Sequence, residues 1–146
     1  MINVQLFAER LSELMFDMSL TQSALANEIN IDRSAISRYL SGRKLPTYEI
    51  FIKLADYFKC TADFLLAIDN ENRYSGFKPC PPFKERLQFL LNKYKKTKYN
   101  MKKETKIAES AIYNWQNGKF NPSVYDLEKL ASYFECSVDF VLGRGD

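Results

Sequence analysis

The sequence from residue 21 to residue 46 reads TQSALANEINIDRSAISRYLSGRKLP, and this stretch decides the fold. Thr21 is a residue suited to capping a helix. Asn30 can end that helix in a left-handed conformation, and Asp32 is placed to cap a further helix that runs to about Ser41. Two short helices joined by a turn of three or four residues form a helix-turn-helix.

Apolar periodicity predicts three more helices around this pair. An amphipathic helix precedes it, with apolar residues at three- and four-residue steps from Leu6 to Met18. Gly42 is expected to end the second helix of the pair. Thr47 and Thr61 then open a fourth and a fifth helix. The stretch is therefore the centre of a five-helix, all-α domain.

The same pattern occurs twice in the chain. Residues 7–66 align without a gap with residues 83–142 at a constant offset of 76, and 22 of the 60 aligned pairs are identical. A repeat of this length exceeds the period of about 20–50 residues typical of solenoids. We expect two tandem domains, 1–68 and 83–146, joined by a Pro-containing linker, 69–82.

Several segments resemble the Cro/phage-repressor (XRE) family of helix-turn-helix domains. They are TQSALA at 21–26, IDRSAISRY at 31–39, GRKLP at 42–46 and, in the second copy, SAIYNWQNGK at 110–119. The segment LADYFKCTADFLL at 54–66 is similar to the last two helices of that family. The resemblance implies two tandem five-helix lambda-repressor-like domains that bind double-stranded DNA. Such proteins are usually dimeric and are most often bacterial or phage repressors.

In the first copy, the helix beginning after Asp32 alternates apolar and polar positions, as expected of a helix that enters the major groove. An arginine there can donate two hydrogen bonds to guanine, which discriminates bases by ~1–3 kcal/mol. The basic residues that follow the helix suit phosphate contact, and the resemblance implies the same for the glutamine that opens the preceding helix. The predicted DNA-binding residues are Gln22, Asp32, Arg33, Ser34, Ser37, Arg38, Arg43 and Lys44.

The second copy departs from this pattern. Ala108 replaces Asp32, so we expect its helix to lose a cap that contributes ~0.5–2 kcal/mol. Glu109 replaces Arg33, and a glutamate repels phosphates although it can accept from the amino group of cytosine. The predicted DNA-binding residues of this copy are Lys98, Lys102, Lys103, Glu109, Ser110, Tyr113, Asn114 and Lys119.

Charge divides the two copies. Residues 1–75 hold eight basic and ten acidic groups, whereas residues 76–146 hold thirteen and eight, so the net charges are −2 and +5. Seven of the fourteen residues in 93–106 are lysines. We therefore expect the first copy to be the base reader and the second to be the stronger phosphate binder.

Composition argues against several other classes of protein. The chain contains no histidine, the commonest general base and metal ligand, and its three cysteines include no CxxC pair. We expect no enzyme activity, no metal, no cofactor and no small-molecule ligand. No apolar run reaches the ~18 residues of a membrane span, and no signal peptide is evident, so we expect a cytoplasmic protein with no membrane association.

The linker and the end of the chain suggest how the protein assembles. Gly76 and the prolines that follow it favour an extended connection, which could span up to ~50 Å if fully stretched. Phe140, Val141 and Leu142 end the chain with little to cover them, which suggests a homodimer contact.

The sequence thus predicts a DNA-binding transcriptional regulator, and we expect it to be a repressor acting by occupancy. The alternative is a protein-interaction module such as an antirepressor or antitoxin. An antitoxin would be expected to carry a separate partner-binding segment, and the two copies leave none over.

Overall fold

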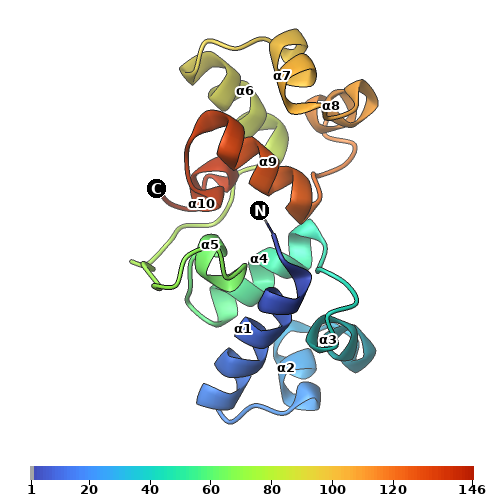
Figure 1. Ribbon diagram of the computed structural model, residues 1–146, viewed down its shortest axis with the longest axis vertical. Helices are drawn as coiled ribbons and strands as arrows, with labels where there is room; N and C mark the ends of the chain where they lie inside the picture. The colour runs from blue at the N-terminus through green and yellow to red at the C-terminus, as the bar shows by residue number, and fades with distance from the viewer. Residues whose placement is uncertain (1) are drawn as a thin grey trace. The chain divides into compact units, whose positions relative to one another are not determined.

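The computed structural model describes residues 2–146, which form ten helices and no strand (Figure 1). The chain divides into two compact units, with the boundary between Ser75 and Gly76. The part that ends at Ser75 is the first unit, and the part that begins at Gly76 is the second. The predicted all-α fold is confirmed. Within the described residues, no helix has the length and hydropathy needed to cross a membrane.

Each unit contains five helices in the same order. Those of the first unit are α1 (Val4–Asp17), α2 (Gln22–Ile29), α3 (Arg33–Leu40), α4 (Tyr48–Tyr57) and α5 (Ala62–Leu65). Those of the second unit are α6 (Phe83–Lys93), α7 (Lys98–Thr105), α8 (Glu109–Gln116), α9 (Val124–Phe134) and α10 (Val138–Leu142).

The buried face of α1 differs from the one expected. Phe7, Leu11 and Met15 are buried at four-residue steps and form one stripe toward the core. Leu6 and Met18, expected at the two ends of the apolar face, are 46% and 50% exposed. The expected stripe was too wide because an apolar side chain need not be buried, and single exposed apolar residues are ordinary on protein surfaces.

The internal repeat is also a repeat of backbone geometry. Residues in the left-handed backbone conformation follow the helices of both units, and they lie at equivalent positions, 76 residues apart. The pairs are Ser19/Lys95, Asn30/Lys106, Gly42/Gly118, Lys59/Glu135 and Ala67/Gly143, with φ between 51° and 77°. Most of these residues carry a Cβ and adopt this conformation at a cost, so the turns are imposed by the packing of the helices that they join.

A pair of identical arginines ties the first helix to the last in each unit. The guanidinium of Arg10 lies 3.9 Å from the ring centroid of Phe64 and donates a hydrogen bond to that residue's carbonyl oxygen. Arg86 repeats this contact with Phe140, at 5.2 Å from the ring centroid. Each arginine satisfies a carbonyl near the end of a short helix and also covers an aromatic ring.

The C-terminal residues do not form an open apolar surface. Val141 and Leu142 are fully buried, because α10 packs against α6 and α9. The expectation that these residues have little cover is therefore wrong, and with it the reason for placing a homodimer contact there. Just beyond them, Nη1 of Arg144 lies 2.7 Å from Oδ1 of Asp139, and both side chains are at most 2% exposed.

Both ends of the predicted linker pack against a unit. The side chain of Asn72 accepts a hydrogen bond from the backbone N–H of Thr61 and donates one to the carbonyl of Lys59. On the other side of the boundary, the guanidinium carbon of Arg144 lies 4.8 Å from the ring centroid of Phe77. Stretching residues 69–82 toward ~50 Å would break these contacts, so the practical reach of the segment is shorter.

Candidate nucleic-acid interface

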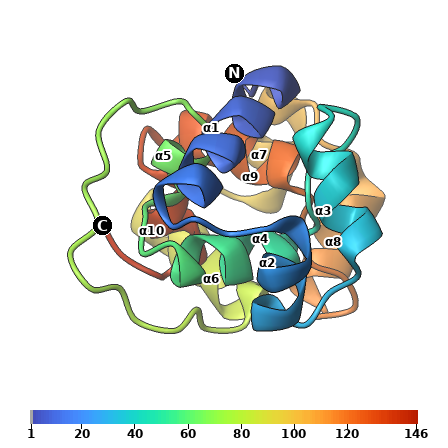
Figure 2. The same ribbon diagram turned by 90° about the horizontal axis from the view of Figure 1, so that it is seen from below.

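The helix-turn-helix of the first unit is formed by α2 and α3, which pack against each other (Figure 2). The side-chain oxygen of Thr21 caps α2 by accepting a hydrogen bond of 3.0 Å from the N–H of Ala24. Asn30 ends α2 with φ 57° and ψ 54°, the left-handed conformation expected from the sequence. Because α3 begins at Arg33, the turn between the helices has the predicted length.

The two faces of α3 separate as predicted. Ile36 and Tyr39 are buried, at 0% and 2% exposed, and hold the helix against the core. Burial raises the pKa of Tyr39, and the neighbouring guanidinium of Arg38 opposes that shift. The exposed side chains on the other face are those expected to meet DNA: Arg33, Ser34, Ser37 and Arg38.

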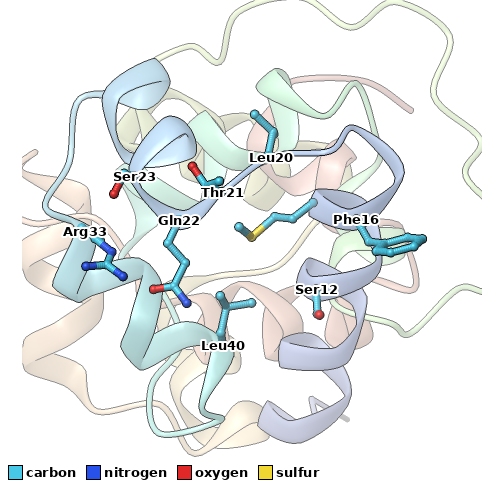
Figure 3. A pocket seen from close by; sticks show the side chains of 9 residues that line it. Ser12, Phe16, Leu20, Thr21, Gln22, Ser23, Arg33 and Leu40 are labelled. Carbon is cyan, nitrogen blue, oxygen red and sulfur yellow. The ribbon is translucent and has the colours of Figure 1, made fainter.

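A hollow lies between α1, α2 and α3, and Gln22 and Arg33 both line it. Figure 3 shows the amide of Gln22 extending from the start of α2 toward α3, between Arg33 and Leu40. Two of the predicted DNA-binding residues, one from each helix of the motif, therefore belong to one surface. Arg43 and Lys44 are exposed just beyond the end of α3.

Asp32 occupies the expected N-cap position of α3, but its side chain makes no capping hydrogen bond. Ala108, at the same position before α8, has nearly the same extended backbone, with φ −60° and ψ 139° against −72° and 140°. The second unit therefore loses no capping hydrogen bond at this position, so the structure supplies no contact to account for the predicted penalty. Backbone geometry starts both helices in the same way without a capping side chain.

The second unit keeps the helix-turn-helix, formed by α7 and α8. Thr97 and Asn100 form a capping box, in which each side chain accepts a hydrogen bond from the other residue's backbone N–H. Lys106 ends α7 in the left-handed conformation that Asn30 adopts in the first unit. Ile112 and Trp115 anchor α8 in the core, at 3% exposed each. Divergence in sequence has therefore left the motif's backbone intact.

Two lysines of α7 are joined to polar side chains of α8. The Nζ atom of Lys98 donates a hydrogen bond of 2.7 Å to Oε1 of Gln116. The Nζ atom of Lys102 lies 3.0 Å from Oε2 of Glu109. Lys98, Lys102 and Glu109 were each expected to contact DNA, whereas Gln116 was not predicted to do so. In this arrangement a phosphate must compete with Gln116 and Glu109 for the two ammonium groups.

The remaining predicted residues of the second unit have different surroundings. Lys103 is exposed and, within residues 2–146, forms no ion pair. Asn114 is half-buried. The other predicted contacts on α8 and after it are exposed: Ser110, Tyr113 and Lys119. Among the three predicted lysines of α7, Lys103 is therefore the one whose ammonium is most readily available to a phosphate.

Two exposed aromatic residues of the second unit were missed by sequence reasoning. Tyr99 is 66% exposed on α7, and Phe120 is 58% exposed after α8. They stand at the positions of Ser23 and Lys44 in the first unit. The signal was available in the repeat, because aligning the copies at the offset of 76 shows small or basic residues replaced by rings.

A hydrogen bond connects α7 to α9 behind the candidate interface. The hydroxyl of Tyr133 donates to Oε1 of Glu104 over 2.7 Å. Burial and this carboxylate raise the pKa of Tyr133 to about 12. The contact holds the basic helix of the second unit against its scaffold.

Comparison with known proteins agrees with this geometry. Residues 17–65 match a family model described as helix-turn-helix, and residues 86–140 match one described as a Cro/C1-type helix-turn-helix DNA-binding domain. The two matches cover α2 and α3 in the first unit and α7 and α8 in the second.

One similar protein is the HTH-type transcriptional activator BcrR of Enterococcus faecalis, which is 36% identical over 61 residues. The aligned region covers 42% of this chain and 30% of that protein, so the chain spans less than a third of the relative's length. No solved structure matches the chain significantly.

Proposed function

The chain belongs to the helix-turn-helix transcription regulators and carries two Cro/C1-type DNA-binding domains in tandem, and from this premise we propose that it regulates transcription by binding specific sequences in double-stranded DNA. The observation that carries the proposal is the division of α3 into a buried face and an exposed polar face. Ile36 and Tyr39 fix the helix, so its arginines and serines project from a rigid support.

We assign base reading chiefly to the first unit. Arg33 stands at the start of α3, where side chains of a recognition helix meet base edges. It is exposed and has space to present its planar fork to guanine O6 and N7. Gln22 shares a surface with Arg33 and is placed to contact a phosphate beside the base.

We assign phosphate contact chiefly to the second unit. Its net charge of +5 attracts DNA independently of sequence, whereas the first unit has a net charge of −2. Lys103 can meet a phosphate directly. Lys98 and Lys102 must first release Gln116 and Glu109, so each contributes less than a lysine without an internal partner.

The proposed mode of regulation is repression by occupancy of a promoter. A domain that covers major-groove base edges excludes other proteins from the same site. The relative BcrR is described as an activator, but the match covers only 42% of this chain, so it does not decide the sign of regulation here.

We further propose that binding to DNA does not depend on a dimer contact through α10, since its Val138, Val141 and Leu142 are buried. Two DNA-binding domains linked in one chain already gain from a high effective concentration. A homodimer remains a prediction, and sedimentation at micromolar protein concentration tests it. A single species of 17.0 kDa would exclude the dimer under those conditions.

The proposal is tested by selecting bound duplexes from a random DNA library and titrating the enriched duplex against a scrambled one. Specific sites are typically bound 10³- to 10⁷-fold more tightly than non-specific DNA. Equal affinity for both duplexes would overturn sequence-specific binding. A reporter with the enriched site across its promoter tests the sign, because repression lowers expression and activation raises it.

A further inference from the structure

A small hollow between α7 and α8 lies on the candidate interface of the second unit. Its volume is about 170 Å³. The buried side chain of Ile112 contributes to its lining, together with Tyr99 of α7 and Tyr113 of α8. The pairs Lys98–Gln116 and Lys102–Glu109 also line it and bridge its two helices. The hollow therefore combines an apolar lining with polar groups that already have partners.

Both tyrosines are specific to the second unit. Tyr99 and Tyr113 are 66% and 64% exposed, and they stand where the first unit has Ser23 and Ser37. Single exposed apolar residues are ordinary in proteins. Here two rings line one hollow on the face that a helix-turn-helix presents to DNA. An apolar group of a ligand could therefore enter the hollow and cover both rings.

The size of the hollow limits what it can take. Pockets for drug-sized ligands measure roughly 300–1,000 Å³, so this one suits a single small apolar group. In the major groove, the four bases differ in such a group, because only thymine carries a methyl at C5. A thymine methyl is apolar and projects into the groove that α8 would enter.

We propose that this hollow binds the 5-methyl edge of a thymine in the major groove. The inference rests on the proposed function and gives the second unit a base preference in addition to its phosphate contacts. Lys102 neutralises Glu109 at the hollow, so the carboxylate need not repel the neighbouring phosphates. Lys98 also lies beside the hollow, where it can exchange Gln116 for a phosphate as the methyl is buried.

The test replaces each thymine of the enriched duplex by deoxyuridine, which removes only the methyl group. Burying one carbon of this kind corresponds to about three- to fivefold in affinity. We expect one position to show this loss in the part of the duplex bound by the second unit. The Tyr113→Ser and Tyr99→Ser variants, which restore the first unit's residues, should bind the two duplexes nearly equally.

Tyr125→Ser supplies the matched control, because Tyr125 is an exposed tyrosine of the same unit, at 48%, and does not line the hollow. It should retain the full difference between thymine and deoxyuridine. Thermal unfolding of all three variants checks that each one folds, which is expected because every substituted residue is exposed.

Four outcomes would overturn the inference. The first is an enriched sequence without a thymine in the part bound by the second unit. The second is that every deoxyuridine duplex is bound as tightly as the original. The third is a tyrosine variant that keeps the methyl dependence. The fourth is a tyrosine variant that keeps all of its DNA affinity, which would indicate that the rings bind a protein partner instead. Failure to enrich any sequence would instead refute the proposed function itself, so the two failures are distinguishable.

Discussion

Lys102 and Glu109 form an ion pair of 3.0 Å across the turn of the second helix-turn-helix. One residue lies near the end of α7, and the other opens α8. Both side chains are substantially exposed, at 44% and 77%, so the pair contributes little to stability. The pair matters instead for DNA binding, because Glu109 holds the ammonium group of Lys102, which could otherwise contact a phosphate.

The Glu109→Gln variant should bind all DNA more tightly. The change removes a negative charge from the interface and releases Lys102 for phosphate contact. One additional phosphate contact makes the slope of log affinity against log salt steeper by ~0.9. Titrations of one duplex at several salt concentrations measure it. An altered base preference at one position would instead show that Glu109 reads a base.

The Arg33→Ala variant should lose ~1–3 kcal/mol of binding free energy on the enriched duplex and much less on a scrambled one. The physical reason is the loss of two hydrogen bonds to one guanine. Lys44→Gln is the control, since Lys44 follows α3 and is proposed to contact phosphate only. It should weaken binding to both duplexes by similar factors. If the Arg33→Ala variant instead lost equal binding free energy on the enriched and scrambled duplexes, Arg33 would contact only phosphate.

Replacing Lys98, Lys102 and Lys103 together by glutamine should flatten the salt slope by between ~1 and ~3. The upper limit assumes that all three lysines bind phosphates, and the lower limit that only Lys103 does. Lys103→Gln alone should account for ~0.9. An unchanged slope in the triple variant would mean that this helix does not meet DNA, and the second unit would then serve assembly.

The Asp139→Asn variant should destabilise the second unit by about 3–5 kcal/mol, because it leaves Arg144 charged and buried without its carboxylate. Asp63 is the repeat counterpart of Asp139, but Ile68 stands where Arg144 would be. Asp63→Asn should therefore cost less. Denaturant unfolding of both variants measures the difference. If the two variants lost similar free energies of unfolding, the ion pair between Asp139 and Arg144 would contribute no additional stability.

Stability should fall at high pH through Tyr133. Its pKa is about 12 in the folded protein, against ~10 in an unfolded chain, so the folded state holds the phenol proton more strongly. The resulting stabilisation is complete below pH ~10 and is lost between pH ~10 and ~12. The difference in unfolding free energy between the wild type and Tyr133→Phe should shrink over that range. A constant difference would contradict the assigned pKa.

The elements of the motif could be predicted because local rules determine them. Thr21 caps a helix, Asn30 ends it in the left-handed region, and Ile36 and Tyr39 face inward, all as expected. Each of these predictions depends only on residues within about one turn of the chain. The repeat extends them to the second unit, where Lys106 adopts the conformation of Asn30 without being a residue that favours it.

The partners of long side chains could not be predicted in the same way. Lys102 and Glu109 are close only because a turn folds α8 back toward α7. Arg144 is buried although arginine is usually exposed, because Asp139 lies within reach in the folded unit. Asp32 fits the preferences for a cap and yet makes no capping bond. Such contacts depend on tertiary packing and on rotamers, which sequence periodicity does not specify.

The most direct test of this account is a parallel selection from one random DNA library by the wild-type chain, the Arg33→Ala variant and the Lys103→Gln variant. We expect a defined sequence for the wild type, the same sequence with one base pair relaxed for Arg33→Ala, and an unchanged sequence for Lys103→Gln. No enriched sequence for the wild type, or a motif altered by Lys103→Gln but not by Arg33→Ala, would contradict this expectation.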